Sequence, residues 1–111
     1  MPHDQRIVVT DVFTEPLTRE PASQVVNGDP QTGILDLCQV GETDVGIWEL
    51  TEGTVRDTEV EELFIVLSGK GRVDFGSGET VDLSPGVCVR LHEGERTTWT
   101  VTETVRKIWI A

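Results

Sequence analysis

About a third of the chain is β-branched, and this feature restricts the fold more than any other. The 111 residues include 16 Val, 6 Ile and 14 Thr, against two Ala and one Met. β-Branched side chains lose rotamer freedom on a helix and pack well on a pleated surface. A hydrophobic fraction of 37%, with three Trp and three Phe, supplies the core of one small domain. We therefore expect a folded, all-β protein.

Short apolar runs, separated by turns that contain glycine, recur through the last two thirds of the chain. They predict eight strands, at residues 34–40, 45–50, 63–67, 72–75, 80–83, 87–91, 98–101 and 105–110. Turns are expected at 68–71, 76–78 and 84–86, so consecutive strands should be hairpin neighbours. Eight short strands without a helical period predict a sandwich or a barrel.

The first third of the chain has a different character. Residues 6–13 predict one strand, whereas three prolines and the Asn27-Gly28 turn signal predict an irregular arm over 14–33. We expect residues 1–33 to form an N-terminal strand and irregular arm, packed on a barrel of residues 34–111.

The charge balance restricts the partners. The chain has 20 Asp plus Glu and nine Lys plus Arg, a net charge of −11. Nucleic acids and anionic membranes bind clustered Lys and Arg, so neither is expected as a partner. Eight of the acids lie in residues 41–62, where Arg56 is the one base. This acidic stretch is either a solvated strand edge or a rim that attracts a basic ligand such as an amine.

No targeting or membrane signal is visible. The N-terminal residues lack the apolar stretch of a signal peptide, and no segment approaches the roughly 20 apolar residues of a membrane span, so we expect a cytoplasmic protein. Cys38 and Cys88 have neither metal-site spacing nor the density of a disulfide scaffold. They are expected to be free, mostly buried thiols.

Two glycine-framed motifs resemble those of the cupin superfamily. Glu62 is followed by six residues and Gly69, and Gly86 by five residues, His92-Glu93-Gly94, two residues and Thr97. More narrowly, residues 46–49, Trp99 and residues 105–107 resemble cupins of the (S)-ureidoglycine aminohydrolase-like and ethanolamine-utilisation type. The resemblance covers about residues 45–110. It implies a double-stranded β-helix, a jelly-roll-like barrel whose mouth is the usual ligand site, commonly assembled as a homodimer.

The metal ligands of the cupin pattern are largely replaced in this chain. Metal-binding cupins present a His-x-His pair, a Glu and a later His. The paired positions fall on Arg56 and Thr58, or on Val55 and Asp57 with one more intervening residue, and the late His falls on Thr97. Glu62 alone remains, and one carboxylate does not hold a divalent transition ion. We therefore expect neither a metal nor another cofactor at this place.

The remaining residues of the frame are candidates for a ligand site. Strand alternation puts Glu62 on the same face as Phe64, which is the inward face if the resemblance holds. Glu62 is the candidate catalytic residue, with Arg56 as its ion-pair partner; the alternatives are a pair that fills a vestigial metal site, or an exposed Glu. Thr58 and Thr97 are candidate hydrogen-bonding positions, and Phe64 and Trp99 are candidate walls.

Two further residues have competing interpretations. His92 is either a base or, more commonly for an isolated histidine, a surface residue. Trp109 is interpreted as a surface or dimer contact, because it alternates against Ile108 and Ile110.

These residues predict a metal-free cupin that binds a small polar metabolite in the barrel mouth, with catalysis left open. Three alternatives stand beside it: a metal-dependent aminohydrolase-like enzyme, a metal-free isomerase or lyase in which Glu62 or His92 carries the proton, and a non-catalytic dimeric accessory protein. The second face of the Glu62 strand, Leu63, Ile65 and Leu67, is also apolar. It should be covered by residues 7–13 or by a second subunit, and we expect a homodimer.

Overall fold

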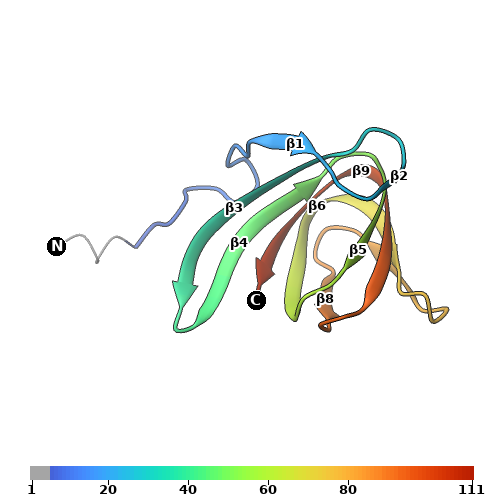
Figure 1. Cartoon of the computed structure of the whole chain (residues 1–111). Helices are drawn as coiled ribbons and strands as arrows, with labels where there is room; N and C mark the ends of the chain where they lie inside the picture. The colour runs from blue at the N-terminus through green and yellow to red at the C-terminus, as the bar shows by residue number, and fades with distance from the viewer. Residues whose placement is uncertain (1–5) are drawn as a thin grey trace.

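The computed structural model describes residues 6–111, in which one sheet of nine strands curls back on itself (Figure 1). The strands are β1 (Arg19–Pro21), β2 (Val25–Asn27), β3 (Gln31–Val40), β4 (Thr43–Leu50), β5 (Gly53–Thr58), β6 (Glu62–Asp74), β7 (Thr80–Leu83), β8 (Cys88–Leu91) and β9 (Arg96–Ile110). The all-β prediction is confirmed. Across residues 6–111 there is no helix with the length and apolar character that a bilayer crossing requires.

The long strand β9 organises the sheet. Its first half pairs with β5 and its second half with β4, while β6 lies along its other edge from Leu63↔Ile110 to Asp74↔Thr98. Both β7 and β8 pair with β6 rather than with each other. The curled sheet encloses an apolar core whose most deeply buried members include Phe64, Val66, Val73 and Leu91.

Two pairs of predicted strands are single strands in the structure. The runs 63–67 and 72–75 join as β6, and the runs 98–101 and 105–110 join as β9. The turn predicted at 68–71 is therefore wrong. There β6 bends through three register shifts against β9, and Gly69 has φ +97°. A side chain at Gly69 would overlap the carbonyl oxygen of Thr104, so glycine permits the close approach of the two bent strands.

The other turns follow their sequence signals more closely. Residues 76–78 separate β6 from β7, and residues 85–86 form the turn between β7 and β8, as predicted. Strand β5 has no counterpart among the predicted runs, because Gly53, Arg56 and Asp57 interrupt its apolar pattern.

The N-terminal segment differs from its prediction. Residues 6–13 do not form a strand; they end in a turn at which Thr14 N–H bonds the carbonyl of Asp11. Instead β1 and β2 form inside the predicted irregular arm, on the edges of β3 and β5. The segment is held on the sheet by Arg106, which donates to the carbonyl of Val12 at 2.9 Å. The predicted boundary between residues 33 and 34 falls inside β3.

Both cysteines are free thiols, but both are exposed rather than buried. Cys38 lies near the end of β3 and Cys88 begins β8. The expectation of mostly buried thiols is wrong, since each side chain points away from the enclosed core.

Candidate functional site

A cavity of about 300 Å³ lies between β4, the two ends of β9 and the connection from β5 to β6. We call it the mouth cavity. All three tryptophans of the chain line it. The complete lining is Ile34, Trp48, Asp57, Thr58, Glu59, Val60, Glu62, Trp99, Lys107, Trp109 and Ala111. The cavity thus combines apolar walls with several ionisable groups, the usual composition of a small-molecule site.

A buried ion pair forms the polar centre of the mouth cavity. Lys107 Nζ on β9 donates to Glu62 Oε2 at the start of β6, at 2.6 Å. Lys107 is 5% exposed. Its Nζ also faces three aromatic rings, 4.3 Å from the centroid of Phe64, 4.6 Å from Trp48 and 5.0 Å from Trp99. We call these three rings the aromatic cage, since their π faces attract the ammonium group.

The surroundings shift two ionisation equilibria. Burial lowers the pKa of Lys107, against the opposing effect of the carboxylates of Glu62, Glu59 and Asp57. Loss of solvent, followed by repulsion from Glu59, raises the pKa of Asp57 at the edge of the cavity. Perturbed groups that face one cavity are typical of functional sites.

Glu59 positions part of the wall. Its side chain is buried and accepts hydrogen bonds from Thr97 Oγ1 at 2.6 Å and from Trp99 Nε1 at 3.0 Å. These bonds orient the Trp99 indole, which meets Trp48 edge to face at 5.3 Å between centroids. The two donors satisfy this carboxyl group in its buried position.

Trp109 is a cavity residue, and its interpretation as a surface or dimer contact is wrong. It is 9% exposed, and its indole lies across Gly46 on β4, where any side chain would overlap the ring. Its Nε1 is buried, and within residues 6–111 it has no hydrogen-bond partner.

The structure brings together four of the predicted site residues. Glu62 and Trp99 line the mouth cavity. The Phe64 ring lies against Lys107 Nζ, and the buried Thr97 donates to Glu59 in the cavity wall. Thr58 is exposed at its edge.

Arg56 lies elsewhere, and the predicted Glu62–Arg56 ion pair is wrong. Arg56 is exposed because it alternates with the buried Val55, and Lys107 is the cation that meets Glu62. His92 is also exposed, 3.3 Å from Glu61 and outside the lining of the cavity.

Sequence reasoning missed Lys107, Glu59 and Asp57. A signal for Lys107 existed, because it lies eight residues after Trp99 and so shares its face on one continuous strand. The prediction of two separate strands hid that relation. Glu59 lies in an acidic run that is typical of solvated surface, and nothing local distinguishes it from its neighbours.

The donor set at this place does not fit a transition metal. Among residues 6–111 no group of three His, Cys, Asp or Glu side chains is placed to hold an ion. The ammonium of Lys107 lies on the Glu62 carboxylate, the remaining acid of the cupin ligand pattern. The second histidine of the chain, His3, is also a possible metal ligand by residue type, but it lies outside the described residues.

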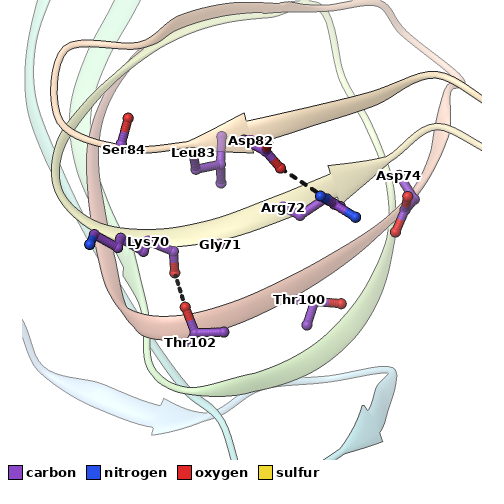
Figure 2. A pocket seen from close by; sticks show the side chains of 9 residues that line it. All are labelled: Lys70, Gly71, Arg72, Asp74, Asp82, Leu83, Ser84, Thr100 and Thr102. Carbon is purple, nitrogen blue, oxygen red and sulfur yellow. Dashed lines mark hydrogen bonds and ion pairs between the residues drawn. The ribbon is translucent and has the colours of Figure 1, made fainter.

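A larger hollow of about 510 Å³ lies on the outer face of β6, β7 and β9 (Figure 2). Arg72 pairs there with Asp82 at 2.9 Å, and Thr102 donates to the carbonyl of Lys70 at 3.3 Å. Lys70, Arg72 and Asp82 are exposed to solvent. Because this hollow lacks buried charged groups and aromatic walls, the mouth cavity is the better candidate site.

Comparison with known proteins identifies the family. Residues 38–109 match the EutQ-like cupin domain. The chain belongs to this family. The double-stranded β-helix and the cupin resemblance are thereby confirmed, whereas the aminohydrolase-like subtype stays a prediction. No curated protein matches the chain.

Solved structures agree on the cupin fold. EutQ from Clostridium difficile is 22% identical over 73% of this chain, with a TM-score of 0.63; the chain spans 61% of its length. A putative ethanolamine utilization protein q from Salmonella typhimurium is 18% identical, covering 85% of this chain and 96% of that one, TM-score 0.64. A Pseudomonas syringae protein of unknown function is 21% identical, with a TM-score of 0.76. That match covers 90% of this chain and 45% of the Pseudomonas protein.

Proposed function

We propose that this EutQ-like cupin binds a small polar molecule in the mouth cavity without a metal ion. The observation that carries the proposal is the Glu62–Lys107 pair, buried inside the aromatic cage and facing a cavity. A charged pair in such a place costs desolvation, and an apolar pair of similar volume is often as stable. Its presence in a cavity therefore favours a role in ligand binding.

The cavity also indicates how the molecule would be held. An ammonium group has three donors, and Lys107 uses one of them on Glu62, so a ligand oxygen can accept another. Trp48 and Trp99 offer flat walls for the less polar part of the ligand. Three carboxyl groups against one lysine disfavour an anionic ligand.

Intrinsic fluorescence tests the proposal directly, because the chain has no Tyr and all three tryptophans line the cavity. A panel of small neutral and cationic alcohols, amides, amines and aldehydes is titrated into the protein. At least one is expected to change the emission saturably. Glu62→Gln should weaken that binding about tenfold, because the neutral amide no longer holds the Lys107 ammonium by a charge-assisted hydrogen bond.

Glu61→Gln is the matched control, since Glu61 is adjacent in sequence but exposed and paired with Arg90. It should leave the affinity unchanged. Absence of a saturable response across the panel, or equal effects of the two substitutions, would contradict the proposal.

The other functions differ in their support. The donor set disfavours the metal-dependent aminohydrolase-like enzyme, and the exposed position of His92 disfavours it as a proton carrier. A metal-free isomerase or lyase that uses Glu62 is compatible with the cavity; loss of turnover in a folded Glu62→Gln variant would establish it. We also propose a cytoplasmic location, which the two exposed free thiols support because such thiols fit a reducing compartment.

A further inference from the structure

We propose that Lys107 is a nucleophilic amine that forms an imine with small neutral aldehydes or ketones in the mouth cavity. This inference rests on the proposed function, because the carbonyl compound must enter the same cavity. It names a substrate class and a covalent step for the site.

The first support is the position of the amine. Lys107 Nζ lies within the aromatic cage, 4.3 to 5.0 Å from the three ring centroids, and its side chain lines the cavity. A lysine in such apolar surroundings loses its proton more readily than one in water, and burial lowers the pKa of Lys107. The ionisable groups that face it are Glu62 on β6, Glu59 in the β5–β6 connection and Asp57 on β5.

The second support is the proton acceptor at 2.6 Å. Transfer of one proton from the Lys107 ammonium to Glu62 Oε2 gives a neutral amine and a carboxylic acid. The amine attacks the carbonyl carbon, a C–N bond forms, and the carbonyl oxygen takes the proton from Glu62. Glu62 then accepts a proton from nitrogen and returns it to the hydroxyl, which leaves as water. The products are one iminium ion and one water, so charge and protons balance.

The third support is that the aromatic cage can stabilise the iminium product as well as the Lys107 ammonium from which it forms. The iminium carries the same single positive charge as the ammonium it replaces, so the three rings and Glu62 stabilise both. The carboxyl groups of Asp57, Glu59 and Glu62 disfavour an anionic oxo acid. A cavity of about 300 Å³ admits a small compound. These features favour neutral aldehydes and ketones.

Reductive trapping tests the inference. The whole protein is incubated at pH 7 with propanal and sodium cyanoborohydride, which reduces an iminium to a stable propylamine. Peptide mapping by mass spectrometry then measures the rate at each amine. The chain has two lysines, and Lys70 is exposed outside the mouth cavity, so it serves as an internal control. We expect Lys107 to be labelled at least about tenfold faster than Lys70, because burial lowers the pKa of Lys107 and the cavity holds the aldehyde beside its amine.

Three comparisons complete the experiment. In denaturant the two lysines should be labelled at similar rates, because the cage is lost. Lys107→Arg keeps a cation beside Glu62 but cannot form the imine, so the fast labelling should disappear. Glu62→Gln should slow Lys107 about tenfold, whereas Glu61→Gln should not, with circular dichroism to confirm that both variants fold.

Labelling of Lys107 no faster than Lys70 in the folded protein would overturn the inference. Saturable fluorescence quenching by propanal without labelling of Lys107 would overturn the imine step alone and leave the proposed function intact. A panel that produces no saturable quenching would overturn the proposed function itself.

Discussion

At the scale of single residues, the Glu62–Lys107 pair couples the site to stability. Both side chains are nearly buried, at 12% and 7% exposure. Lys107→Met would leave the Glu62 carboxylate without its cation, and removal of one partner of a buried pair costs about 3 kcal/mol or more. Glu62→Gln in the same chain should recover much of that loss, since no charge then remains unpaired. Urea denaturation of the two single variants and the double variant measures the coupling.

The exposed pair Arg72–Asp82, 2.9 Å apart on the outer face, is the control (Figure 2). Arg72→Met should cost less than about 1 kcal/mol, because water screens both charges. Strictly additive effects at Glu62 and Lys107 would show that the buried pair is not coupled.

At the scale of elements, β6 and β9 bend together where their pairing register shifts. Phe64 and Val73 lie on opposite sides of the bend in β6, and both reach the core. Gly69 lies at the bend, with φ +97° and the carbonyl of Thr104 where a side chain would be. We expect Gly69→Ala to destabilise the protein by about 3 kcal/mol or more, from backbone strain and overlap together.

Gly78 is the matched position, with φ +94° and open space around it. Gly78→Ala should cost about 1 kcal/mol, the conformational part alone. Thermal denaturation of both variants separates the two causes. Equal losses would mean that overlap at the bend contributes nothing.

At the scale of the whole molecule, an apolar row remains on the outer face of the sheet. Ile108 on β9 and Ile65 on β6 are cross-strand neighbours there, Ile108 half-buried and Ile65 36% exposed, whereas Ile47 beside them on β4 is fully buried. Residues 6–13 form no strand over it. The row holds no charged side chain, so two copies can meet there despite a net charge of −11. We propose a homodimer through this face and expect the mass of two chains in light scattering.

Ile65→Lys should give the mass of one chain with the fold retained, because it places a charge in the buried interface. Val26→Lys, at a 50% exposed valine on β2, should leave the dimer intact. A wild-type mass of one chain would contradict the proposal.

Much of the site's geometry depended on strands that meet only after folding. The alternation around Glu62 predicted that Glu62 and Phe64 share a face, and both lie at the cavity. The partner of Glu62 was predicted wrongly, because Arg56 is near in sequence whereas Lys107 is 45 residues away. Glu59 resembles a surface acid until Thr97 and Trp99, on a distant strand, supply its donors.

The sequence by itself determined the all-β class, the glycine frame of a cupin, and the face on which each residue of a strand lies. Composition and a period of two residues are local properties, so they survive without knowledge of the neighbours. Only the tertiary structure decided which strands are continuous, which cation meets Glu62, and that Trp109 closes the cavity. Those outcomes depend on bends and pairing registers between distant segments, because a side chain's alternation gives its direction but not what it meets.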